Sequence, residues 1–380
     1  MKSNRYFLVI FFLMMAILPE TRGQTALPKK CYMHLNGNID KTMQIEMNLV
    51  RINDTLYGNY TFLTEPKDPK LRGGNFIPVG GKVKPDGSFI LKEIPGQEGA
   101  VFKGKFENAQ ILKGIWENEK GDINLPFDLA EKYPEGIIPL SLSYQKASTP
   151  LVKKPKSPVA TIEIALLVPA ESSNSIVSDT VKKIILGKFE ERLVKSQNPN
   201  PDMILNSMKQ VYFENYISTN EAIYNKTQGV SFNWESIKLM DIIYNSSWYL
   251  CFSIDHYAFT GGAHGMENKD FIVINTRTGK IIDLTDIFTV DSGEELMHLL
   301  TNKIKEKYKI LLSARLMENG FFTDEIKPNS NFYITSKGIG FHYNPYEFAP
   351  YSFGSTDIFL SYGEISQFIR SDSFVKGIIR

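Results

Sequence analysis

Cysteine and histidine are scarce in this 380-residue chain, which limits the disulfides and metal sites that it can form. The two cysteines, Cys31 and Cys251, lie in different halves of the chain, so no framework of disulfides can hold the fold. One bridge in an oxidising compartment and two buried free thiols are both compatible with this spacing. The five histidines are scattered, and neither H-E-x-x-H nor C-x-x-C occurs, so we expect no metal site and no cofactor.

The chain also lacks an excess of charge of either sign. Its 43 basic and 42 acidic residues leave a formal net charge of +1. A nucleic-acid partner would require a basic face, so this class of partner is not expected. Because 42% of the residues are hydrophobic and 12% are aromatic, the chain can bury more than one core, and we expect two domains.

Long apolar runs are missing except near the start. Lys2 and Arg5 precede the apolar run Tyr6 to Leu18, which is followed by a short polar stretch ending at Gly23. This order is typical of a secretory signal peptide, predicted here over residues 1–23. As a helix, the run would span only about 20 Å of the ~30 Å hydrocarbon layer, so stable membrane insertion is not expected. We predict an exported protein, periplasmic or extracellular.

Residues 31–131 contain eight short runs in which apolar and polar residues alternate, separated by turn pairs such as Asp86-Gly87. Alternation with a period of two predicts an antiparallel β-barrel or sandwich. Four glycines stand two positions before an aromatic residue, which suits strand curvature with ring packing or a carbohydrate-stacking face. A barrel with an open interior would instead carry a small apolar molecule.

Residues 132–159 are rich in proline and predict an extended linker that contains at most one strand, near 138–144. The second domain, 160–370, begins with a strand-like run at 160–168. Helical spacing follows over 175–193 and 202–224, and Asn200-Pro201 is suited to start the second helix.

Two long strand-like runs, 231–244 and 247–259, come next and are joined at Asn245-Ser246. An amphipathic helix is predicted over 293–312, with its lysines on the solvent side, and three short strands and a short helix end the domain. The overall prediction is therefore mainly β, with a mixed α+β C-terminal domain.

The segment YAFTGGAHG, residues 257–265, places Gly261, Gly262 and Gly265 around His264. Glycines permit a tight turn, in which the imidazole either bonds to the backbone or serves as a general base. Asp255, His256 and Glu267 are near in sequence, but the sequence does not show that they converge. Tyr257 and His264 are candidate binding residues, and the three glycines are assigned to the turn.

A second segment, GIGFHYNPYEFAPYSFG at residues 338–354, is dense in aromatic residues held between prolines. Aromatic rings fill cores and also stack on sugars, and prolines lower the entropy lost on binding. We take Tyr343, Tyr346, Glu347 and Tyr351 as candidate binding residues, with core packing as the alternative role of the rings.

These two segments, in this order, resemble the RsiV-like extracytoplasmic domain, shared by RsiV-type anti-sigma factors and PdaC-type peptidoglycan deacetylases. The resemblance covers 160–369 and implies a sensing or accessory binding domain. In the anti-sigma factors the partner is lysozyme. In the deacetylases a separate metal-dependent domain does the chemistry, and its aspartate pair and His-x-x-x-His motif are not recognisable here.

We therefore expect a non-enzymatic exported protein that binds a cell-envelope ligand, either peptidoglycan or a wall-acting protein such as lysozyme. The alternative is a hydrolase or deacetylase that acts on wall glycans with His264 as general base.

Overall fold

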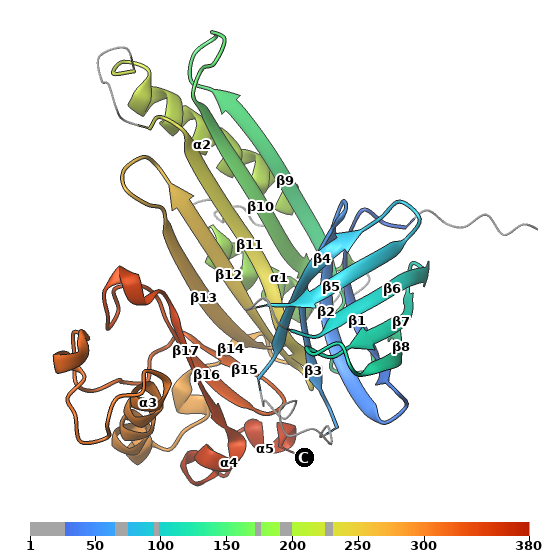
Figure 1. Cartoon of the computed structure of the whole chain (residues 1–380), viewed down its shortest axis with the longest axis vertical. Helices are drawn as coiled ribbons and strands as arrows, with labels where there is room; N and C mark the ends of the chain where they lie inside the picture. Colours follow the sequence, from blue (N-terminus) through green and yellow to red (C-terminus); the bar gives the residue numbers. More distant parts are fainter. Residues whose placement is uncertain are drawn as a thin grey trace, which may run out of the picture.

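The structure is a computed structural model, and it describes residues 27–64, 75–94, 99–171, 176–190, 200–224 and 231–379. The predicted signal peptide lies outside these residues. The described chain has three parts, which are a barrel, a long twisted sheet with two helices, and a C-terminal lobe (Figure 1). This arrangement confirms the predicted fold class, mainly β with an α+β C-terminal region.

The barrel is antiparallel and closed, because its first strand pairs with both the second and the last. Its interior is filled, with Tyr60, Phe102 and Trp116 at most 1% exposed. A Cβ added at Gly104 would lie 2.7 Å from the rings of Phe89 and Phe127, so this glycine makes room for packed rings. The strands are β1 (Lys30–Ile39), β2 (Met43–Ile52), β3 (Thr55–Phe62), β4 (Ile77–Val83), β5 (Ser88–Glu93), β6 (Val101–Asn108), β7 (Ile111–Glu117) and β8 (Asn124–Glu131).

The long sheet has the strand order β14-β13-β12-β11-β10-β9, and only the β10–β11 pair is parallel. The crossover between those two strands contains both helices, whose apolar residues Val181, Ile185 and Ile204 share a core with the sheet. Asn200 caps the second helix by accepting from the Asp202 N–H, as predicted. The elements are β9 (Leu140–Pro150), β10 (Val159–Pro169), α1 (Ile176–Phe189), α2 (Pro201–Asn220), β11 (Trp234–Ser246), β12 (Tyr249–Phe259), β13 (Met266–Asn275) and β14 (Lys280–Ile281).

Two sequence-based expectations are wrong in this region. The expected linker contains a longer strand than the one allowed near 138–144, because residues 140–150 form β9 and pair in full with β10. Prolines stand beside and at the end of this strand, so its interior keeps its hydrogen-bond donors. The β11–β12 turn lies at Ser247 and Trp248, which take φ angles of 54° and 69°, and not at the preceding asparagine.

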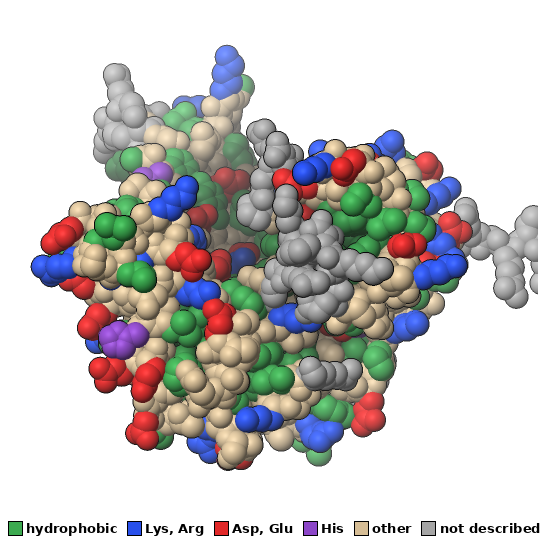
Figure 2. Space-filling view, turned by 60° about the horizontal axis from the view of Figure 1, so that its bottom comes forward, with side chains coloured by type: hydrophobic (Ala, Val, Ile, Leu, Met, Phe, Trp, Pro, Cys, Tyr) green, Lys and Arg blue, Asp and Glu red, His purple; other side chains and the backbone are tan. Residues whose placement is uncertain are grey.

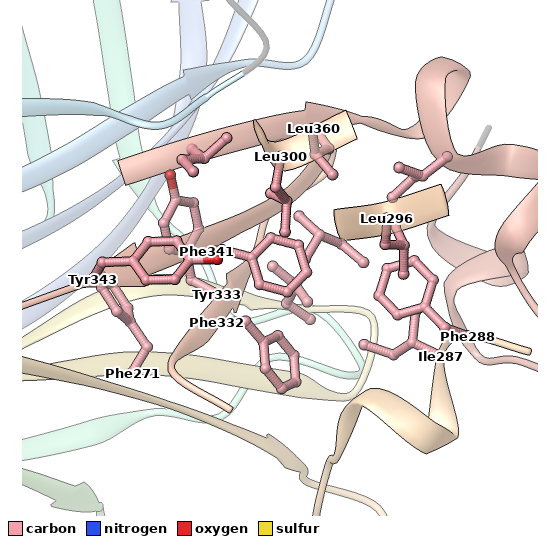
Figure 3. Packing of buried hydrophobic residues seen from close by; sticks show 14 of the residues in the cluster. Phe271, Ile287, Phe288, Leu296, Leu300, Phe332, Tyr333, Phe341, Tyr343 and Leu360 are labelled. Atoms are coloured by element: carbon pink, nitrogen blue, oxygen red, sulfur yellow. The ribbon is translucent and has the colours of Figure 1, made fainter. Parts of the chain in front are cut away.

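The C-terminal lobe packs a helix and a three-stranded sheet against β13. Leu296 and Leu300 of the helix meet Phe341 and Leu360 of the small sheet, with Phe271 of β13 in the same core (Figure 3). The helix ends at Lys307 and not at residue 312. The elements are α3 (Gly293–Lys307), β15 (Phe332–Ile334), β16 (Gly338–Tyr343), β17 (Thr356–Ser361), α4 (Tyr362–Ile365) and α5 (Val375–Ile378).

The barrel is attached to the long sheet through buried polar contacts. Asn245 is fully buried, and its amide donates to the Ile138 carbonyl (2.8 Å) and the Tyr32 hydroxyl (3.1 Å). Its side-chain oxygen accepts from the Ile138 N–H at 3.1 Å. Val50 and Ile52 of the barrel join the apolar core of the sheet. None of the helices in the described ranges has the length and apolar character needed to cross a bilayer.

Candidate functional site

The turn between β12 and β13 depends on its glycines. Gly261 and Gly262 take φ angles of 95° and 98°, which other residues rarely adopt. The turn leaves His264 exposed, with Nδ1 at 2.8 Å from the Gly265 carbonyl oxygen. The imidazole stacks on Tyr351, with ring centroids 4.0 Å apart and planes 17° apart. His264 therefore fixes the turn to the loop of the C-terminal lobe.

Two tyrosines contact Gly265, and a third packs on one of them. The Tyr351 hydroxyl donates to the Gly265 carbonyl at 3.0 Å. The ring of Tyr257 fills the space beside Gly265, where an added Cβ would lie 2.4 Å from it. Tyr346, 49% exposed, lies against Tyr351 at 5.8 Å between centroids. We call His264, Tyr257, Tyr346 and Tyr351 the aromatic cluster.

The other two candidate residues lie apart from this cluster. Tyr343 is 5% exposed and belongs to the lobe core (Figure 3). Its hydroxyl donates to the Lys327 carbonyl at 2.7 Å. Its burial contradicts the expectation that it contributes to a binding surface. Glu347 is exposed and accepts from the amides of Asn329 and Asn344, each at 3.3 Å.

A pocket of about 240 Å³ adjoins the aromatic cluster, with Tyr257 in its lining. The strand registers place Leu239, Asp255 and Lys269 opposite one another on β11, β12 and β13, so they share one face of the sheet. Ile237, Tyr257 and Glu267 form the next such row. We call this space the sheet-edge pocket.

The C-terminal lobe supplies the opposite side of the sheet-edge pocket. His342 of β16 and Asp357 of β17 are cross-strand partners, and Nδ1 lies 3.0 Å from the carboxylate. Asn344 bonds to both backbone groups of Lys269, at 2.7 and 3.2 Å, which holds the lobe against β13. Sequence reasoning noted Asp255 and Glu267, and it named Asp357 only as an acid that could contact a basic partner. It missed His342 and its pairing with Asp357, because the two residues lie on different strands.

Carboxyl groups dominate the electrostatics of the pocket. Lys269 pairs with Asp255 at 3.1 Å between Nζ and Oδ2. Burial acts to lower the pKa of Lys269, but Asp255 and Asp241 outweigh it and the pKa is raised. Burial, and then repulsion from Asp255, raises the pKa of Asp241 to about 7. Figure 2 shows acidic and basic side chains side by side in a hollow between the barrel and the C-terminal lobe.

The imidazole in an acid–base arrangement is therefore His342 and not His264. The residues that the structure describes place no carboxylate in hydrogen-bond contact with His264, whose recorded partner is a backbone oxygen. His256 also lines the sheet-edge pocket, and burial followed by the charge of Lys238 lowers its pKa. Within the described ranges no group of three His, Cys, Asp or Glu residues is placed to hold a metal ion.

Two family models match the C-terminal region. Residues 154–267 match the family described as "Deacetylase PdaC", and residues 285–363 match "Protein of unknown function (DUF3298)". The sheet-edge pocket draws Asp255 and Glu267 from the first range and His342 and Asp357 from the second. The barrel lies outside both ranges, and no curated protein matches the chain significantly.

Among solved structures, a DUF3298 family member from Bacteroides fragilis is similar in fold, with a TM-score of 0.59. It is 23% identical, and the match covers 65% of this chain and 99% of that one. A DUF3298 family protein from Pseudomonas aeruginosa gives a TM-score of 0.43 at 16% identity, covering 61% of this chain and 95% of that one. The C-terminal region thus contains PdaC-like and DUF3298-like regions, and a DUF3298 protein has a similar fold.

Proposed function

We propose that the protein is an exported binding protein that recognises a cell-envelope ligand, either peptidoglycan or a wall-acting protein such as lysozyme. The observation that carries this proposal is the contact of the aromatic cluster with the polar sheet-edge pocket through Tyr257. The N-terminal sequence pattern supports export.

The aromatic cluster suits recognition because its rings are partly exposed and held in place. Stacking of His264 on Tyr351 and the bond from Tyr351 to Gly265 fix the cluster before a ligand arrives. Fixed side chains lose little entropy on binding, and aromatic faces stack on sugars. The pocket beside them supplies carboxylate and amide groups for hydrogen bonds.

The matches to the PdaC and DUF3298 models support an envelope ligand, because the first covers β11 and β12 and the second covers β16 and β17, which line most of the site. The finer assignment to the RsiV-like domain, whose anti-sigma members bind lysozyme, is part of this proposal and rests on the two sequence motifs. We therefore keep both ligand classes, and a binding experiment separates them.

The test uses the chain from Gln24 onward, without the predicted signal peptide. It measures retention on purified peptidoglycan and, separately, titration against lysozyme. We expect one ligand to bind and the double variant Tyr346→Ala/Tyr351→Ala to weaken that binding by about tenfold or more. Phe322→Ala is the matched control, because Phe322 is a similarly exposed ring (53%) of the same lobe outside the cluster. Failure to bind either ligand would refute the proposal.

A second candidate function, a hydrolase or deacetylase acting on wall glycans, draws support from the His342–Asp357 pair in the sheet-edge pocket. An imidazole oriented by a carboxylate is suited to general acid–base work. Turnover of peptidoglycan fragments that persists in His264→Ala and disappears in His342→Gln would favour this candidate. Absence of turnover in the wild-type protein would remove it.

A further inference from the structure

The sheet-edge pocket has two kinds of wall. Ile237, Leu239 and the ring of Tyr257 provide apolar surface from the sheet. The carboxyl groups of Asp255, Glu267 and Asp357 line the same space. A ligand that suits both walls has a short methylene chain that ends in a positive charge, because such a chain packs on apolar surface while its charged end meets acids.

The pocket is negatively charged at neutral pH. Asp255, Glu267 and Asp357 line the pocket together with Lys269 and His342, and the nearby Asp241 also acts on Lys269. Even with Asp241 neutral and the imidazole protonated, carboxylates outnumber cations. The remaining imidazole in the lining, His256, is kept neutral by its lowered pKa. A cationic ligand therefore enters with favourable electrostatics.

Several acceptors in the pocket have unused hydrogen-bonding capacity. Oδ2 of Asp255 pairs with Lys269, but Oδ1 of Asp255 is buried without a partner in the described part of the chain. The side chain of His342 is 2% exposed, and Nε2 is likewise buried and without a partner there. When Nδ1 donates to Asp357, Nε2 is an acceptor. Buried polar atoms are rarely left unpaired, and an ammonium group brings three donors.

We infer that the sheet-edge pocket binds an aliphatic primary ammonium group, supplied by the side chain of a diamino acid in the peptide part of peptidoglycan. This inference rests on the proposed function and identifies the part of the ligand that the pocket recognises. A volume of about 240 Å³ fits a single side chain and not a folded surface. Because Tyr257 belongs to both the pocket and the aromatic cluster, one wall fragment can place a sugar on the cluster and its amine in the pocket.

The test begins with a small probe. Nα-acetyl-lysine amide is titrated against the mature chain, with the Nε-acetylated form as the matched ligand that lacks the positive charge. We expect the free amine to bind at least about tenfold more tightly, because acetylation removes the charge that pairs with the carboxylates. Equal affinity of the two probes would overturn the inference.

Variants then locate the binding. Asp357→Asn and Glu267→Gln should each weaken binding of the amine several-fold, whereas Glu318→Gln, an exposed acid of the same lobe outside the pocket, should not. Glu267 is exposed and has no ion-pair partner in the described residues, so its variant keeps the fold even if Asp357→Asn disturbs the lobe. Unchanged affinity in Glu267→Gln would contradict the assignment.

The source of the amine is decided with muropeptides whose diamino acid is free or N-acetylated. We expect only the free form to bind; a pocket that accepts lysozyme lysines but rejects both muropeptides would overturn the assignment to peptidoglycan. Retention of intact peptidoglycan by a Glu267→Gln/Asp357→Asn variant at the wild-type level would refute the pocket inference and leave the proposed function standing. Binding of the amine probe without any retention of peptidoglycan would refute peptidoglycan as the source of the amine, and the lysozyme titration would then decide the proposed function.

Discussion

Replacement of Asn245 by alanine should loosen the attachment of the barrel to the long sheet. Asn245 lies in β11 with its side chain fully buried, and it uses both its amide and its oxygen. Its three hydrogen bonds join Ile138, in the segment between barrel and sheet, to Tyr32 of the barrel. Alanine has no side-chain amide, so it cannot form any of these three bonds.

The magnitude follows from the groups left behind. Alanine would leave the buried N–H and C=O of Ile138 without hydrogen-bond partners, and each unpaired buried group costs about 1–3 kcal/mol. The Tyr32 hydroxyl would still donate to Asn48 at 2.7 Å, so it adds little. We therefore expect a loss of about 3 kcal/mol in the free energy of unfolding.

Urea denaturation followed by circular dichroism measures this loss. Tyr32→Phe is the matched control, because it removes only one of the three bonds of Asn245, together with the Tyr32–Asn48 bond, and should cost about 1–2 kcal/mol. A change below about 1 kcal/mol for Asn245→Ala would show that water or local rearrangement satisfies Ile138, and it would refute the proposed attachment.

Three further predictions concern separate parts of the molecule. Gly265→Ala should destabilise the protein by about 1–3 kcal/mol, because the new Cβ would overlap the ring of Tyr257. Gly262→Ala would meet no atom within 4 Å and should cost only about 1 kcal/mol of backbone strain, and thermal melting compares the two variants. Burial raises the pKa of the Cys251 thiol to about 12 and that of the Cys31 thiol to about 11. Both thiols should therefore react with iodoacetamide at pH 8 only after the protein unfolds, and fast labelling of the native protein would contradict this prediction. Burial raises the pKa of Glu46 to about 7, so between about pH 4.5 and 7 the folded state holds a proton that the unfolded state has released, and the free energy of unfolding falls as pH rises through this window. Glu46→Gln should flatten this decline in urea denaturation at several pH values, and an unchanged slope would exclude the effect.

Local patterns in the sequence were enough to predict much of the fold. Alternation with a period of two located the barrel strands, and Asn200-Pro201 marked the start of α2, because each signal depends on neighbouring residues. Strand β9 was expected only as a short strand in a linker, because the prolines at its ends resemble those of a linker. The β11–β12 turn was misplaced because Asn245 is a common turn residue but is used here in the core.

The candidate site was only partly accessible from the sequence. The glycine-rich turn and the loop of tyrosines were visible as motifs, and the structure brings His264, Tyr257, Tyr346 and Tyr351 together. The sheet-edge pocket was not visible, because it depends on strand register and on the docking of β16 and β17 against β13. Nothing local marks His342 as the partner of Asp357.

Calorimetric titration of the mature chain with solubilised peptidoglycan fragments is the most direct test of the function proposed for the aromatic cluster and its pocket. We predict saturable binding at one site, weakened about tenfold or more in Tyr351→Ala. Absence of binding heat under conditions where the protein is folded, together with no response to lysozyme, would contradict it.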